Sequence, residues 1–300
     1  MFFTSTRNVS IAAWALGMTL FLGGCTLKQA RVASVALTVQ DVAQAAAKQS
    51  DPTIVREGMP AYLMLIDGLI EAYPENKDLL MAGCQAYGTY ASSFVAEEER
   101  DKGEALYRKA RQYGFRALTA LGKGDFQKLA SGNLEDFTAF LGRFKKEDVP
   151  ILFWTTNAWA SWISNNLSSV EALADLAPLE ASMKRILELD DTFYHGSPHL
   201  LMGVYLAAKP PIMGGDLSKA RQHFDRAFAL GAGKFLMSKV LYAQYYARGL
   251  KDSDLFTRAL QDVLAAPVDE APELTLSNVL AKEKAKRLLG KAGEYFAAQP

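Results

Sequence analysis

Apolar residues recur at helical spacing along almost the whole chain. Val32, Val35, Ala36 and Val39 fall at positions i, i+3, i+4 and i+7, which is the spacing of one face of an α-helix. The same spacing returns many times, and alternating stretches of β-branched residues, typical of strands, are almost absent. The pattern predicts an all-α fold.

Residues that begin or end helices divide this pattern into segments. Asp51 before Pro52 predicts a helix start, and Tyr73 before Pro74 predicts its end. Further helices are expected from Asn76 toward Val95, from the charged stretch 97–102 to about Gly122, and around Phe126 and Phe137. Others are expected over the aromatic segment 151–165, from Ser168 or Ser169 to Leu189, and after Asp216 as an N-cap. Glycine and proline cluster only in the joints, so we expect one compact domain.

Three of the predicted helices carry a similar triplet. The matched positions are Tyr107, Ala110 and Gly114, then Met183, Ile186 and Asp190, then Phe224, Ala227 and Gly231. A period of roughly 40 residues is close to that of tetratricopeptide-like helical pairs. We therefore expect a solenoid array of helical hairpins, with Gly203, Ala220 and Ala227 at close crossings, and a non-repeating helical array as the alternative.

The first 24 residues have the features of an export signal. Arg7 precedes an apolar run too short to span a bilayer, and Leu22-Gly23-Gly24 leads directly to Cys25. This order is typical of a bacterial lipoprotein signal, so we expect a signal peptide over 1–24, a lipidated Cys25, a tether over 25–31 and a helical domain over 32–300. An ordinary signal peptide with an incidental cysteine is the alternative.

Charge and cysteine content argue against nucleic-acid binding and against a reactive thiol. The chain has 33 basic and 33 acidic residues, which leaves no general basic field for nucleic acid. Cys84 has no intramolecular partner once Cys25 is lipidated, and its helical neighbours are apolar, so a buried structural thiol is expected over a reactive one.

A helix rich in tryptophan is the best candidate for a binding site. Residues 149–170 carry no charge, yet they are too polar for a membrane span. We expect a buried helix whose ligand-binding residues are Trp154, Asn157, Ala158, Ser161 and Trp162, with the indoles lining an apolar channel. A tryptophan stripe packed in the core is the alternative.

Catalytic and metal motifs are missing from the sequence. It has no nucleophile elbow, zinc-protease helix, phosphate-binding loop or dinucleotide fingerprint. His195 and His199 are four residues apart, but Gly196 and Pro198 lie between them. His223 lies in a separate helix, and no acidic ligand or cysteine completes the set. We expect no metal, no cofactor and no enzyme activity, with a hydrolase that uses His195 or His199 as a remote third class.

The C-terminal two-thirds of the chain resembles the T component of TRAP transporters. The resemblance rests on the order of several segments, because none is decisive alone, and residues 30–130 match only in their hairpin pattern. The segments are Phe153 with Trp154, Ala158–Ile163, Met183–Asp190, His195–His199, Met213–Phe224, Lys239–Arg248, Leu274–Leu276 and Asn278.

The resemblance implies a lipoprotein with tetratricopeptide-like repeats that partners a periplasmic solute-binding protein of a TRAP system. It is compatible with a homotrimer around a pore and with an apolar ligand. Thr26 after Cys25 favours the outer membrane of a Gram-negative bacterium, facing the periplasm. The alternative is a helical-repeat lipoprotein that acts as a scaffold in outer-membrane or cell-wall assembly and holds no small molecule.

Overall fold

The computed structural model describes residues 35–297. The expected signal peptide, Cys25 and the tether lie outside the described residues. By its internal contacts the chain divides into two units, 1–42 and 43–300. In the first unit the described residues are helical from 35 onward, and everything below concerns the second unit.

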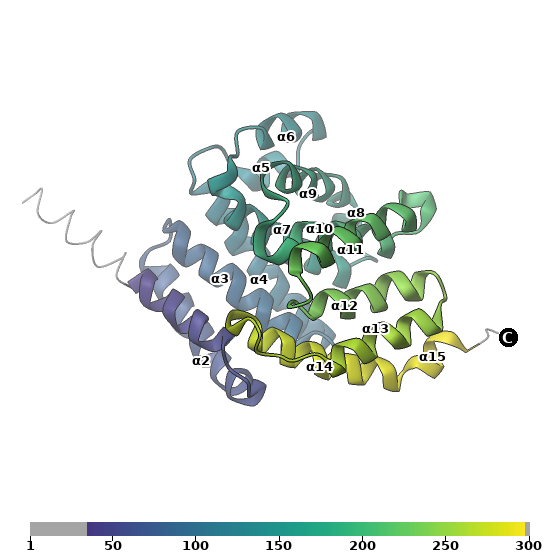
Figure 1. Cartoon of the computed structure of the whole chain (residues 1–300). Coiled ribbons are helices and arrows are strands. Elements are labelled where there is room, and N and C mark those ends of the chain that lie inside the picture. The colour runs from purple at the N-terminus through teal and green to yellow at the C-terminus, as the bar shows by residue number, and fades with distance from the viewer. Residues whose placement is uncertain (1–34, 298–300) are drawn as a thin grey trace, which may run out of the picture. The chain divides into compact units, whose positions relative to one another are not determined.

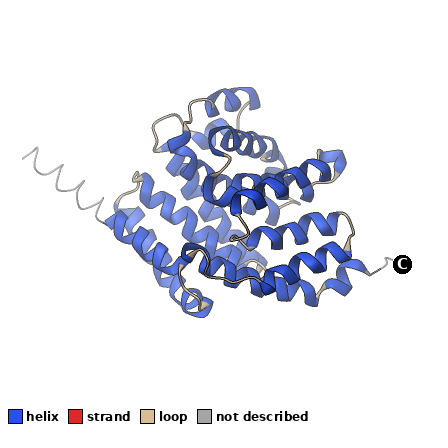
Figure 2. Cartoon of the chain, in the orientation of Figure 1, coloured by secondary structure: helices blue, strands red, loops and turns tan. Residues whose placement is uncertain are grey.

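The described part of the second unit consists of helices joined by short loops (Figures 1 and 2), and the described residues contain no strand. The α-helices are α2 (Pro52–Ala72), α3 (Lys77–Tyr90), α4 (Arg100–Thr119), α5 (Phe126–Ala130), α6 (Leu134–Leu141), α7 (Val149–Asn165), α8 (Val170–Ala174), α9 (Leu176–Asp190), α10 (Phe193–Ala208), α11 (Leu217–Gly231), α12 (Met237–Leu241), α13 (Ser253–Ala265), α14 (Thr275–Gly290) and α15 (Ala292–Phe296). Two π-helical segments, η1 (Ala91–Val95) and η4 (Tyr242–Ala247), and three short 3-10 turns, η2 (Lys146–Asp148), η3 (Pro211–Met213) and η5 (Pro272–Leu274), complete the order. The all-α prediction is confirmed.

Local capping explains most of the helix starts. The Asp51 side chain accepts a hydrogen bond from the Thr53 amide at 2.8 Å, and Asn76 accepts from the amides of Asp78 and Leu79 at 3.0 and 2.9 Å. Asp216 accepts from the Lys219 amide at 2.9 Å. Each side chain satisfies amides that the first helical turn leaves without a partner, so these three predicted starts are confirmed.

The helix predicted from Ser168 or Ser169 to Leu189 is instead two helices. Ser169 makes no side-chain cap, α8 ends at Ala174, and α9 begins again at Leu176. Pro178 has no amide with which to bond the Ala174 carbonyl, so the first helix cannot continue through it. The carboxylate of Asp175 at the break is bonded to the indole of Trp159.

The most extensive packing joins α10 with α11 and α3 with α4, which are consecutive along the chain, and α4 with α7, which are separated by α5 and α6 (Figure 1). Contacts between α14 and α2 bring the last long helix back to the first. Glu97, just before α4, forms ion pairs with Lys284 and Arg287 of α14 at 2.9 and 3.1 Å. The sequence pattern gave no indication of this long-range contact.

The predicted triplets lie in the core at all but one position. Tyr107, Ala110, Met183, Ile186, Phe224 and Ala227 are buried, as are Gly114 and Gly231. Asp190 is partly exposed and pairs with Lys146. At Gly114 a side-chain carbon would lie 2.6 Å from the hydroxyl oxygen of buried Thr155, so only glycine permits α4 to approach α7 this closely.

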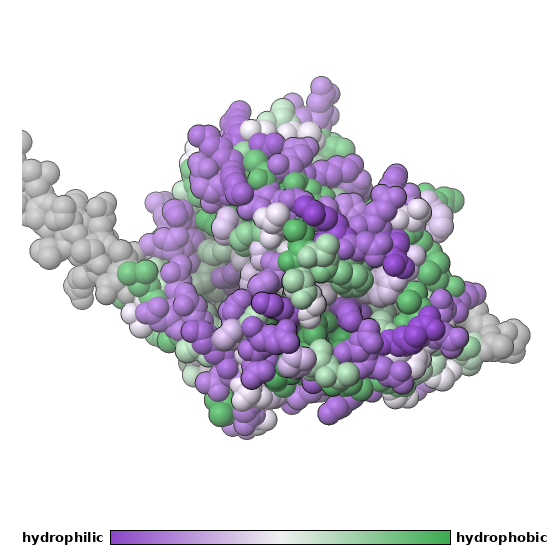
Figure 3. All heavy atoms as spheres, viewed as in Figure 1, coloured by the Kyte–Doolittle hydropathy of each residue, from purple (hydrophilic) through white to green (hydrophobic). Residues whose placement is uncertain are grey.

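The α10–α11 hairpin also follows the sequence prediction. Ala220 and Ala227 are buried, and a side-chain carbon at Gly203 would lie 3.3 Å from the ring of Phe224. On the face of the molecule seen in Figure 3, hydrophilic and hydrophobic residues are interspersed. No described helix is long and apolar enough to cross a bilayer.

Candidate functional site

The tryptophan-rich segment forms α7, as predicted. Pro150 lies in its first turn, where a missing amide costs nothing. Most of its residues are buried, including Thr155 and Thr156, and the Thr156 hydroxyl donates to the Leu152 carbonyl at 2.7 Å. The uncharged run is therefore a core helix of the second unit, covered by α4 on one side and α9 on another.

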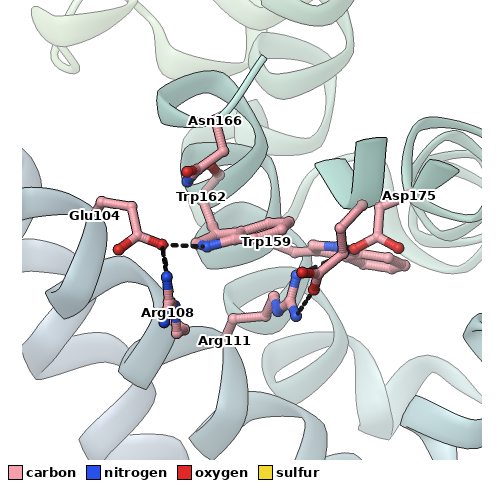
Figure 4. A network of polar contacts seen from close by, with 8 residues as sticks. Glu104, Arg108, Arg111, Trp159, Trp162, Asn166 and Asp175 are labelled. Carbon is pink, nitrogen blue, oxygen red and sulfur yellow. Dashed lines mark hydrogen bonds and ion pairs between the residues drawn. The ribbon is translucent and has the colours of Figure 1, made fainter. Parts of the chain in front are cut away.

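Two of its indoles are fixed by carboxylates on the buried side (Figure 4). Trp162 donates its indole N–H to Glu104 at 3.0 Å, and Trp159 donates to Asp175 at 2.7 Å. Both indoles are almost fully buried. Trp162 and its neighbour Ala158 thus lie on the packed side of α7.

Arg111 of α4 lies next to both indoles. Its guanidinium carbon is 3.8 Å from the centre of a Trp162 ring, within range of a cation–π interaction. The same guanidinium donates to Asp175 at 3.1 Å and to Glu171 at 2.8 Å. This cluster joins α4, α7 and the α8–α9 break, and we name it the Arg111 cluster.

Burial shifts the pKa of one carboxyl group in this cluster. Desolvation raises the pKa of Asp175 above its ordinary value, although the Trp159 hydrogen bond and the Arg111 charge both act to lower it. The Arg111 side chain is 10% exposed and that of Asp175 is 17% exposed, so the pair is largely removed from water. Every carboxylate here is already bonded, which indicates a positioning role for the cluster.

The neighbouring face of α7 is partly open to solvent. Trp154, Asn157 and Ser161 fall at i, i+3 and i+7 on this face, and all three are partly exposed. Ser161 donates its hydroxyl to the Asn157 backbone carbonyl at 2.9 Å. Within the described part of the chain, the Asn157 side-chain amide makes no hydrogen bond, so a donor and an acceptor remain free beside an indole.

Aromatic rings extend this face toward α10. The ring centres of Trp154 and Tyr194 are 5.1 Å apart, and the two rings meet edge to face. The Tyr194 ring centre lies 6.0 Å from that of Phe235 and 5.4 Å from that of His195. We name Trp154, Tyr194, His195 and Phe235 the aromatic row. The sequence pattern did not single out Tyr194 or Phe235.

The backbone under this row is strained. Tyr194 and His195 have φ values of 41° and 58°, followed by Gly196 at 77°. Left-handed φ in a residue with a side chain costs about 1 to 3 kcal/mol and is concentrated at functional sites. Gly196 is required, because a side-chain carbon there would lie 2.8 Å from Leu230.

A family model for the TRAP transporter T-component matches residues 48–296. The chain belongs to the TRAP transporter T-component family. A comparison with curated proteins finds no match. The family match covers the whole region in which α7, the aromatic row and the Arg111 cluster lie, and it includes residues 48–130, where the sequence resembled the family only in its helical pattern.

The histidines of this T component are placed for contacts within the fold. His195 approaches Glu273 at 3.5 Å, whereas His199 and His223 face each other with 2.9 Å between their Nδ1 atoms. Asp191 approaches the other ring nitrogen of His199, so it cannot bind the same ion as the two facing Nδ1 atoms. Residues 35–297 contain no group of three or more side chains arranged to hold a metal.

Two further features of the T component concern packing. Cys84 is buried, its thiol donates to the Trp154 carbonyl at 3.6 Å, and burial raises its pKa to about 12, so the expected structural thiol is confirmed. A cavity of about 30 Å³ lined by Phe228, Phe235 and Lys239 has room for one water molecule. It is too small for a transported solute.

Proposed function

We propose that this T component is a lipid-anchored protein on the periplasmic face of the outer membrane, acting as a binding or scaffold component of TRAP-type solute uptake. Its proposed partner is the periplasmic solute-binding protein of the same system, and its proposed assembly is a homotrimer. The observation that carries the association with TRAP uptake is the family match over 48–296. The lipoprotein-type signal before Cys25 supports the location.

The anchor is tested by one substitution. Cys25→Ser should abolish lipid labelling and leave the protein soluble or uncleaved, because acyl chains on a cysteine thiol and a new amino terminus hold a protein far more firmly than one chain can. Metabolic labelling with a fatty acid, followed by membrane fractionation, measures both effects. Cys84→Ser is the matched control and should label normally, so unchanged attachment of Cys25→Ser would contradict the anchor.

We further propose that an apolar solute is held against the open face of α7. Trp154 offers an apolar ring, and Asn157 and Ser161 offer polar groups beside it, which is the mixture expected of a small-molecule site. Tyr194, on a strained turn, closes one end of this face. Ala158 and Trp162 form the rigid wall behind it, fixed to α4 through Glu104.

Two tryptophan variants separate binding from packing. Trp154→Ala should reduce the amount of apolar molecule that native mass spectrometry finds on the extracted protein, with a stability loss below the roughly 3 to 5 kcal/mol expected for a core tryptophan. Trp162→Ala should lose stability in that full range, because its indole is buried on Glu104 and Arg111. Thermal unfolding of both variants gives the comparison.

The same measurement can reject the ligand site. Wild-type protein extracted without any bound apolar molecule, together with equal large stability losses in the two variants, would make the whole tryptophan stripe part of the core. The protein would then be a scaffold without a small-molecule ligand.

A further inference from the structure

His199 of α10 and His223 of α11 form a direct contact between the two helices. Their Nδ1 atoms are 2.9 Å apart, and the ring centres are 5.1 Å apart with a tilt of 40°. Both rings are partly buried. At this distance the two nitrogens share a hydrogen bond.

The number of protons on the pair decides whether this hydrogen bond exists. One Nδ1 must donate while the other accepts with its lone pair. A neutral pair satisfies this condition, and so does a pair that has gained one proton. A pair that has gained two protons has a donor and a positive charge on each side, so the rings must separate.

The neighbouring charged groups make the two rings unequal. Asp191, in the turn before α10, approaches Nε2 of His199 at 3.3 Å and is itself paired with Arg226 of α11 at 3.1 Å. Asp191 and Arg226 are the charged groups that affect His199, and His199 is the charged group that affects His223. Asp191 favours the first proton on His199, and the charge of His199 then opposes a proton on His223.

Burial opposes protonation of both rings. It lowers the pKa of both histidines from the ordinary value, and it is the largest cause for each. A depressed pKa means that the unfolded chain binds protons more readily than the folded chain does. The contribution of the pair to stability is therefore complete above the ordinary histidine pKa and is lost as the pH falls below it.

The pair lies beside the strained turn of the aromatic row. His199 follows Gly196 by three residues, and Gly196 packs on Ala227 and Leu230 of α11. His223 lies one helical turn before Ala227. The histidine contact and the Gly196 contact together hold the start of α10 against α11. Tyr194 belongs to this start of α10, and its ring contacts Trp154.

We propose that the His199–His223 pair is an acid-sensitive latch. When both rings are protonated, the latch opens, the start of α10 separates from α11, and the turn at Tyr194–Gly196 relaxes from its left-handed conformation. The opening follows from the contact itself. Its consequence for a solute on α7, release on acidification, rests on the proposed function.

The test is a proton-resolved titration of the full-length protein. Imidazole resonances are followed by NMR from about pH 7.5 to about pH 5, the range in which histidine changes charge, and amide exchange in α10 and α11 is measured over the same range and corrected for intrinsic rates. We expect two coupled steps, the second below the ordinary histidine value. Protection of residues 199–203 should fall across the second step by roughly tenfold for each pH unit, since opening takes up one more proton.

Two variants make the result specific. His223→Gln keeps a side chain that can accept a hydrogen bond but cannot titrate, so His199 should titrate in one step and the acid-induced loss of protection should disappear. Lys219→Gln, the control on the exposed side of α11, should leave both steps unchanged. Independent titration of His199 and His223 at ordinary values, or protection that stays constant through the second step, would overturn the latch and leave the α7 ligand site untouched.

Discussion

Replacing Arg111 by methionine is expected to lower the free energy of unfolding at neutral pH by about 3 to 5 kcal/mol. Methionine fills a similar volume, so the loss comes from charge and not from a cavity. Asp175 would keep its carboxylate in a largely buried site with only the Trp159 indole as a partner, and an unpaired buried charge is costly. Urea denaturation monitored by circular dichroism measures the difference.

The control for this prediction lies one turn earlier on the same helix. Arg108 pairs with Glu104 at an i, i+4 spacing, and its side chain is 57% exposed. Exposed helix pairs of this kind contribute about 0.3 to 0.5 kcal/mol, so Arg108→Met should be close to neutral. Equal effects at positions 108 and 111 would contradict the assignment of Arg111 as a buried positioning residue.

The pH dependence of the Arg111→Met loss follows from Asp175. Desolvation already raises the pKa of Asp175, and removing Arg111 takes away one of the groups that lower it. A carboxylate with a raised pKa in the folded state gains stability as the pH falls through that pKa. The difference between variant and wild type should therefore shrink from neutral pH toward about pH 4, near the ordinary aspartate value, and Asp175→Asn in the variant background should remove the trend.

Replacing Asn278 by alanine is expected to cost about 3 kcal/mol. Asn278 is 1% exposed and accepts from the Leu236 amide at 3.0 Å while it donates to the carbonyls of Lys234 and Val268 at 2.9 and 3.1 Å. Alanine leaves the buried Leu236 amide and two partly buried carbonyls without this partner, and a buried backbone group left without a partner costs about 1 to 3 kcal/mol. Thermal and urea unfolding should agree on the loss.

Asn133 provides the comparison for Asn278. It also accepts from backbone amides, those of Glu135 and Asp136 at 2.8 and 3.3 Å, but it is an exposed N-cap. Asn133→Ala should cost about 1 kcal/mol, the usual value for such a cap. A loss at Asn278 no larger than this would mean that the loops before α12 and after α13 are held by other contacts.

Features that depend on neighbouring residues in the sequence were predictable. Each N-cap hydrogen bond joins residues within one turn of helix, as at Asp51, Asn76 and Asp216. The apolar spacing that places Phe224 and Ala227 in the core also depends on residues within one turn. The split between α8 and α9 was also within reach, because Pro178 is visible in the sequence. It was missed because the apolar spacing continues across the break.

Features that depend on contacts between distant segments were not predictable. Helical periodicity places Trp154, Ala158 and Trp162 near one another, but it cannot say that Arg111 of α4 covers Trp162 while Trp154 stays partly open. The facing of His199 and His223 depends on the register of the α10–α11 hairpin. Tyr194 has a left-handed φ two residues before Gly196, which packs on α11, and the sequence marks only the glycine.

The most direct test of the account is whether this T component binds its TRAP solute-binding protein. The purified solute-binding protein of the same system is titrated onto the full-length protein in detergent, and complex formation is followed by light scattering and by biolayer interferometry. We expect a saturable complex of fixed stoichiometry that survives Cys25→Ser, since the proposed lipid would hold the protein on the membrane and not on its partner. Two folded proteins that remain separate at every concentration would contradict it.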